Sequence, residues 1–68
     1  MKFLRVQDNI FNIYDIVEVS QSNNSIYFHI RTNDSHLNIK IINYKTKQLA
    51  HADFERIHNE LLTLTATP

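Results

Sequence analysis

The sequence predicts an α+β fold: an antiparallel β-meander of four to five strands with one C-terminal α-helix packed on one face. Two observations carry this prediction. Apolar and polar residues alternate through residues 26–31 and 36–41, and a period of two is typical of a half-buried strand. Beyond Tyr44 the apolar residues recur every three to four positions, which is the period of an amphipathic helix.

The first strand is expected at residues 2–6. A turn at Asp8 and Asn9 follows it, because both residues accept positive φ better than most. This turn would pair Leu4 with Ile13 and Val6 with Phe11. A charged residue, Asp15, then falls on the apolar side of the next run. The chain is therefore expected to bend around Tyr14 and Asp15, which divides this run into two short strands.

Two polar segments, residues 21–24 and 32–35, are expected to form four-residue hairpin loops, since they are rich in residues that favour turns. The first loop would place Val19 opposite Ile26 and Val17 opposite Phe28. The second would place Ile30 opposite Leu37, Phe28 opposite Ile39 and Ile26 opposite Ile41. In these registers three strands present one continuous apolar face.

The helix is expected to cover that face with an apolar stripe formed by Ala50, Phe54, Ile57, Leu61 and Leu64. Its start has two alternatives. Thr46 could cap a helix that begins at Lys47, or residues 47–50 could be extended and the helix could begin near Ala52. The β-branched residues around Leu64 and the terminal Pro68 mark its end.

Length and composition narrow the function classes. A chain of 68 residues forms one domain, residues 1–68, and a domain of this size buries only about 60% of its unfolded surface. With no cysteine, neither a disulfide nor a thiolate zinc site can stabilise it. Association into a homo-oligomer is therefore expected. No apolar run reaches the roughly 18 residues of a membrane span and no signal peptide is visible, so a cytoplasmic protein is predicted.

No enzymatic activity and no cofactor are predicted. The chain lacks a cysteine nucleophile and has no glycine for a phosphate-binding loop, and a domain this short has little room for a substrate pocket of about 300 Å³. His51, Glu55 and His58 are spaced i, i+4 and i+7 on one flank of the helix. That spacing could suit a divalent cation, but it is more typical of a polar border beside a core stripe, and no metal site is predicted.

A partner-binding face is predicted on the outer side of the meander. It would contain Tyr27, His29, Arg31, Lys40, Ile42 and Tyr44. In the expected registers Glu18 lies in a row with Tyr27 and Lys40, and Ile16 lies in a row with His29 and Asn38. The alternative ligand is single-stranded nucleic acid, with Tyr27 stacking a base while Arg31 and Lys40 track phosphates. Seven basic residues balance seven acidic ones, and Glu18 would repel a phosphate backbone, so a protein partner is favoured.

The run from Asp8 to Val19 resembles the opening of the small FlbD-like flagellar proteins, which also end with a helix. Those proteins usually carry an Asn-Gly turn, and glycine is absent here. The order of four strands and then a helix is also similar to coactivator-type single-strand binders, whose basic excess this chain lacks. These similarities imply a topology and do not carry a function.

The function predicted from the sequence is a non-enzymatic interaction module that binds a protein partner and self-associates. Unpaired sheet edges are templates for strand addition, and they are expected at residues 2–6 and 37–42. The chain is rich in asparagine and isoleucine and has no glycine, which indicates an AT-rich coding genome. A small regulator or inhibitor from a phage or another mobile element fits that composition.

Overall fold

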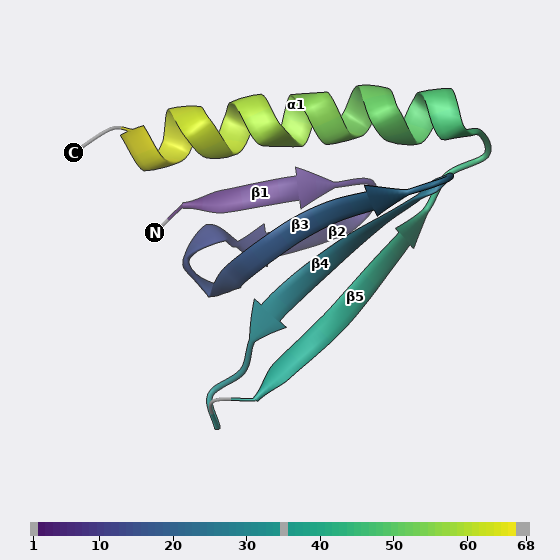
Figure 1. Ribbon diagram of the computed structural model, residues 1–68. Helices are drawn as coiled ribbons and strands as arrows, with labels where there is room; N and C mark the ends of the chain where they lie inside the picture. The colour runs from purple at the N-terminus through teal and green to yellow at the C-terminus, as the bar shows by residue number, and fades with distance from the viewer. Residues whose placement is uncertain (1, 35, 67–68) are drawn as a thin grey trace.

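The computed structural model describes residues 2–34 and 36–66. Its elements are β1 (Phe3–Val6), β2 (Asn9–Asn12), the short 3-10 helix η1 (Ile13–Asp15), β3 (Ile16–Ser22), β4 (Ser25–Arg31), β5 (Leu37–Asn43) and α1 (Lys47–Ala66). Strands β1 and β2 form an antiparallel hairpin, and β3, β4 and β5 form a separate antiparallel sheet in that order. The predicted α+β class is confirmed: five antiparallel strands in two sheets precede one C-terminal helix (Figure 1).

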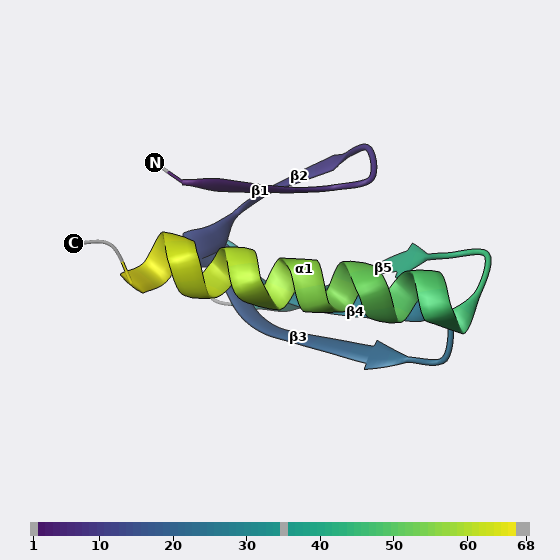
Figure 2. The same ribbon diagram turned by 90° about the horizontal axis from the view of Figure 1, so that it is seen from above.

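The helix lies over the space between the two sheets. Seen from above, α1 runs between the β1–β2 hairpin on one side and β3 on the other, with β4 and β5 beneath it (Figure 2). The β1–β2 hairpin, the larger sheet and the helix all contribute to one buried core, which consists of Leu4, Val6, Phe11, Ile13, Ile26, Phe28, Ile42, Ala50 and Ile57. At its centre the rings of Phe11 and Phe28 stack with their centroids 4.4 Å apart, which joins the hairpin to the larger sheet.

The predicted register of the first hairpin is wrong by two residues on one strand. Leu4 lies opposite Phe11 and Val6 lies opposite Asn9, because the turn is made by Gln7 and Asp8 with Gln7 at a φ of 53°. This shift keeps the same side chains on the core face. Ile13 is not in the strand: it begins η1, where the Asn12 side chain accepts a hydrogen bond from the Tyr14 N–H at 3.0 Å. The predicted bend around Tyr14 and Asp15 is confirmed.

The predicted register of the second hairpin is also wrong. Its turn has two residues, Asn23 and Asn24, with Asn23 at a φ of 55°, so Val19 pairs with Phe28 in place of Ile26. An irregularity between residues 16 and 18 reverses the expected orientation of two side chains. Ile16 lies opposite Ile30 and packs against the core, although it was expected on the outer face. Val17 is 49% exposed, although it was expected in the core.

The third hairpin differs from the prediction by one residue, which exchanges the two faces of β5. Its loop spans five positions, 32–36, and Arg31 pairs with Leu37. Ile39 therefore lies opposite His29, and Ile41 lies opposite Tyr27. Because side chains alternate between the faces of a sheet, a slip of one residue moves every side chain to the other face.

The helix begins at Lys47, which confirms the first of the two expected starts. The Thr46 hydroxyl accepts a hydrogen bond from the Leu49 N–H at 3.1 Å and so caps the first turn. The predicted stripe is confirmed as well: two of its residues are fully buried, and Phe54, Leu61 and Leu64 pack against the core. Within the described residues, no helix is long and apolar enough to cross a membrane.

Candidate functional site

The outer edge of β5 is open. Among the described residues, β4 is the only strand hydrogen-bonded to β5. Opposed residues of an antiparallel pair alternate between those that exchange both backbone hydrogen bonds and those that exchange none. The Thr32 N–H donates to the His36 carbonyl, and the Tyr44 N–H donates to the Asn24 carbonyl, both at 2.8 Å. These bonds place the bonded pairs at the even-numbered positions of β5, so the backbone groups of its odd-numbered residues point outward.

The same odd-numbered residues carry exposed aliphatic side chains. Leu37, Ile39 and Ile41 are 59%, 58% and 49% exposed on the outer face of the sheet, and we call them the β5 ridge. The helix covers the opposite face of the sheet. It approaches β5 only near the C-terminal end of that strand (Figure 1), where Ile42 is buried. The β5 ridge therefore combines apolar surface with backbone groups that no described residue pairs, on three consecutive outward positions.

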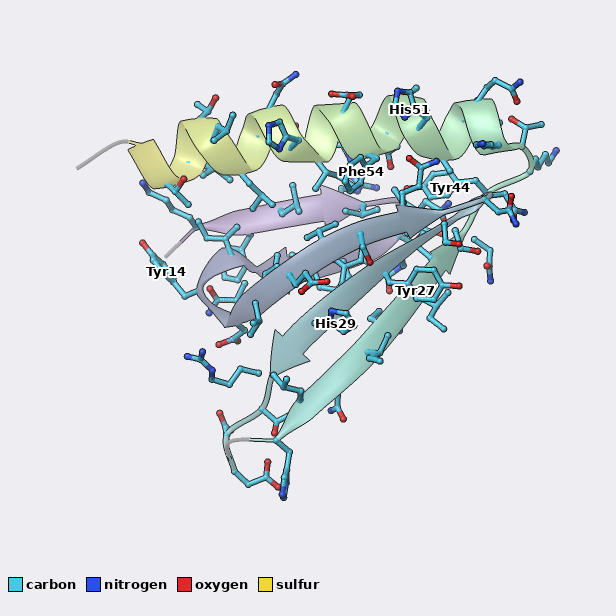
Figure 3. The ribbon with its side chains drawn as sticks, in the orientation of Figure 1. Tyr14, Tyr27, His29, Tyr44, His51 and Phe54 are labelled. Atoms are coloured by element: carbon cyan, nitrogen blue, oxygen red, sulfur yellow. The ribbon has the colours of Figure 1, made fainter. Side chains whose placement is uncertain are left out.

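The β5 ridge is bordered by polar and aromatic side chains of β4. On the outer face Tyr27 lies opposite Ile41, His29 lies opposite Ile39 and Arg31 lies opposite Leu37. Tyr27 and His29 project from the same side of β4 (Figure 3). The His29 Nδ1 is 3.6 Å from the Glu18 carboxylate on β3. The outer face thus carries an acid–imidazole pair across β3 and β4 and an aliphatic surface at the β5 edge.

Two features limit the open edge of β5. At its C-terminal end the Gln7 side-chain amide donates to the outward-pointing carbonyl of Asn43 at 3.0 Å, so that acceptor is already occupied. At its N-terminal end the strand stops at the loop, where the Thr32 hydroxyl donates to the His36 carbonyl at 3.0 Å. Hydrogen bonds from Thr32 and His36 lower the pKa of Asp34 in this loop. The open edge therefore spans residues 37–41.

The predicted site residues fall on different sides of the sheet. Tyr27, His29 and Arg31 share the outer face, as expected from their alternation. The expected outer position of Lys40, Ile42 and Tyr44 is wrong. Lys40 pairs with Phe28 and Ile42 pairs with Ile26, so both lie on the inner face, where Ile42 is 3% exposed. Tyr44 is half-buried beside the helix.

Tyr44 belongs to a polar cluster that fastens the helix to the sheets. Its hydroxyl donates to the Asp53 carboxylate, and burial together with this bond raises the pKa of Tyr44. Burial alone would raise the pKa of Asp53, but hydrogen bonds from Arg56 and Tyr44 and the charge of Arg56 lower it overall. The Arg56 guanidinium also donates to Glu60 at 3.0 Å. This cluster orders the connection between β5 and α1.

The second predicted edge, at β1, is covered by the helix. The Arg56 guanidinium donates to the Arg5 carbonyl at 3.0 Å, and the Lys2 ammonium donates to the Leu64 carbonyl at 2.6 Å. An incoming strand would have to displace Arg56 from β1. The β1 edge is therefore a poorer acceptor than the edge of β5.

The remaining edge of the larger sheet, at β3, borders a hollow beside the helix. This hollow measures about 280 Å³, and its apolar lining includes Ile16, Val19, Phe54 and Leu61. The Gln21 side chain on β3 contacts the His51 imidazole at 3.3 Å, which ties one end of the strand to α1. The irregularity near Val17 also interrupts the regular spacing of backbone groups that strand addition requires.

The three helix residues considered as metal ligands do not form a cation site. His51 Nε2 is 3.6 Å from the Glu55 carboxylate, which is the geometry of an exposed i, i+4 pair. His58 lies one turn further on and lines the hollow beside β3. Among the described residues, no group of three or more His, Cys, Asp or Glu side chains is arranged to hold a metal ion.

Searches against protein-family models, curated proteins and solved structures return no significant match.

Sequence reasoning missed the three residues of the β5 ridge as outer-face residues. The consecutive apolar residues Ile41 and Ile42 signal that the register is open, since a strand that is apolar at two successive positions fits either face. The deciding information is in the loop. Thr32, Asp34 and His36 bond to one another within this loop. The pairing of Arg31 with Leu37 gives the loop five positions and sets the odd-numbered residues of β5 on the outer face.

Proposed function

We propose that the protein is a non-enzymatic interaction module that binds a protein partner by accepting an extended strand on the outer edge of β5. In strand addition, main-chain hydrogen bonds supply affinity and alternate side chains supply specificity. The observation that carries the proposal is that Leu37, Ile39 and Ile41 offer both. Their backbone groups point away from β4, and their side chains form an aliphatic row that solvent reaches.

The contrast among the edges supports this choice. Natural proteins protect sheet edges with charges, bulges or covering elements. Here Arg56 covers β1, and β3 has an irregular start beside the helix. On β5 one charged residue, Lys40, interrupts an otherwise neutral strand, and its side chain lies on the face away from the β5 ridge. An edge left open next to apolar surface is typical of an interaction site.

The chemistry of the outer face favours protein over nucleic acid. A single-strand binder needs stacking rings and a positive groove along the backbone path. Lys40 lies on the inner face, and Glu18 pairs with His29 in the centre of the outer face. The β5 ridge instead presents aliphatic side chains, which match apolar side chains of a peptide strand. The role that fits a small binder of this kind is that of a regulator or inhibitor that covers a surface of its target.

The proposal is tested by capture experiments with matched variants. Ile39→Lys places a charge in the centre of the β5 ridge. Ile10→Lys places the same charge at a strand position that is 69% exposed in the other sheet. Proteins that bind through β5 should be retained by the wild type and by Ile10→Lys and lost with Ile39→Lys. An identical set of captured proteins with all three baits would contradict strand addition at β5.

A further inference from the structure

We infer that the strand accepted by β5 is β5 of a second copy of this chain, which pairs antiparallel about a two-fold axis at Ile39. The inference rests on the proposed function, because it assigns a partner to the same open edge. It joins two three-stranded sheets into one continuous sheet of six strands, with three from each copy. Both helices then lie on the same side of that sheet.

The length and position of the open edge fit a symmetric pairing. An isologous contact requires each residue to face its symmetry counterpart. The open edge covers residues 37–41, between the loop and the Asn43 carbonyl that Gln7 occupies. Its central residue is Ile39. A two-fold axis there places Ile39 opposite Ile39 of the second copy and Leu37 opposite Ile41 of the second copy. All of these residues have outward backbone groups, so each opposed pair exchanges both hydrogen bonds.

The side chains fit this register on both faces. On the outer face the two β5 ridges lie side by side, and each aliphatic side chain gains an aliphatic neighbour directly across the joint. On the inner face Lys40 lies opposite Asn38 of the second copy, so no like charges meet. The hairpin loop with the exposed Asp34 carboxylate also approaches the segment of the second copy that carries the exposed Lys45.

The neighbouring symmetric registers are less favourable. An axis at Lys40 would place two ammonium groups directly opposite each other, and like charges at that position are destabilising. An axis at Asn38 would move Ile41 beyond the end of the second copy's strand. The backbone groups of Ile41 would then have no partner in that strand. The single charge of β5 and the ends of the strand therefore select the axis at Ile39.

The expected affinity is modest. An interface made by one strand from each copy buries less than the roughly 800 Å² per partner of a standard interface. A dissociation constant on the order of micromolar is therefore expected. Sedimentation or light scattering across a concentration series should show the wild type passing from monomer to dimer. Ile39→Lys should remain monomeric at the highest concentration, and Ile10→Lys should dimerise like the wild type.

The absence of native cysteine allows the register to be tested by disulfide formation. Directly opposed residues have Cα atoms about 5.5 Å apart, within disulfide range, whereas symmetry mates at the next position are offset by about 7 Å along the strand. Under mild oxidation Ile39→Cys should cross-link many-fold faster than Asn38→Cys, Lys40→Cys and the control Ile10→Cys. Each variant can be checked for its fold by circular dichroism before oxidation.

The outcomes separate this inference from the proposed function. A strictly monomeric wild type at hundreds of micromolar, with Ile39→Cys cross-linking no faster than Ile10→Cys, would overturn the homodimer. Strand addition at β5 would then still stand if captured proteins depend on Ile39. Fastest cross-linking of Lys40→Cys or Asn38→Cys would overturn the assigned axis. A concentration-dependent dimer that is lost with Ile39→Lys and is cross-linked by Ile39→Cys supports the inference even if no other protein is captured.

Discussion

The backbone N–H of Thr32 donates to the carbonyl of His36 at 2.8 Å, and this bond closes the loop between β4 and β5. Because the loop closes with five residues, every side chain of β5 lies on the face opposite to the one that a four-residue loop would give. Neighbouring residues show the effect. Ile41 is 49% exposed on the outer face, whereas Ile42 is 3% exposed in the core. The face on which the aliphatic side chains of β5 are exposed thus depends on the geometry of one loop.

The first prediction concerns the stack between Phe11 and Phe28 at the junction of the two sheets. Phe28 is fully buried, so Phe28→Ala should lower the free energy of unfolding by about 3–5 kcal/mol through lost transfer energy and a residual cavity. Phe3→Ala is the matched control, because Phe3 is 55% exposed. Urea denaturation followed by circular dichroism measures both. Equal losses for the two variants would contradict the central position assigned to Phe28.

The second prediction concerns the start of the helix. Thr46→Ala removes the oxygen that accepts from the Leu49 N–H and should cost about 1 kcal/mol of stability. Thr46→Ser keeps that oxygen and should recover most of the loss in the same urea experiment. If the alanine and serine variants unfold at the same urea concentration, the hydroxyl does not cap α1.

The third prediction concerns the acid limb of stability. The pKa of Asp53 is lowered in the folded state from its ordinary value of 3.8, so its ionised form favours folding. This contribution is present above pH 3.8 and is lost as the pH falls through the lower folded value. Asp53→Asn should therefore reduce stability at neutral pH and flatten its decline in acid. Asp8→Asn, in the exposed turn of the first hairpin, is the control. It should leave the decline of stability in acid as steep as in the wild type.

The fourth prediction concerns nucleic acid. A labelled single-stranded oligonucleotide should show no change in fluorescence anisotropy with tens of micromolar protein at low salt, because Lys40 lies on the inner face and Glu18 stands beside His29. Binding that weakens steeply with salt and falls with Tyr27→Ala would contradict this expectation. Base stacking on Tyr27 would be worth about 1–3 kcal/mol in that comparison.

The sequence predicts the fold class well because the relevant signals are local. Alternation and helical spacing identify the elements, Asp15 marks the bend, and Thr46 is a capping residue at the correct position. The registers are a different matter, since all three expected pairings are wrong. Each depends on turn geometry, including the positive φ of Gln7 and of Asn23, and polar residues on both sides of a turn fit several turn lengths equally well.

The candidate site was only partly predictable for the same reason. Tyr27, His29 and Arg31 share a face whatever the neighbouring registers are, because they belong to one strand. Lys40 and Ile42 were assigned across a hairpin, and the five-residue loop moved both to the inner face. The edge position of β5 was predictable from its place as the last strand. The cover over β1 was not, because it depends on Arg56, which is distant in the sequence.

Amide hydrogen exchange measured by NMR at individual β5 residues tests the central claim most directly. In dilute protein the amides of Ile39 and Ile41 should exchange fast because they point outward, while those of Lys40 and Ile42 should be protected by their bonds to β4. At high concentration, pairing with a second copy should slow Ile39 and Ile41 and leave the even-numbered amides unchanged. Protection of Ile39 and Ile41 in dilute protein, with fast exchange at Lys40 and Ile42, would contradict both the register and the open edge on which the proposed function depends.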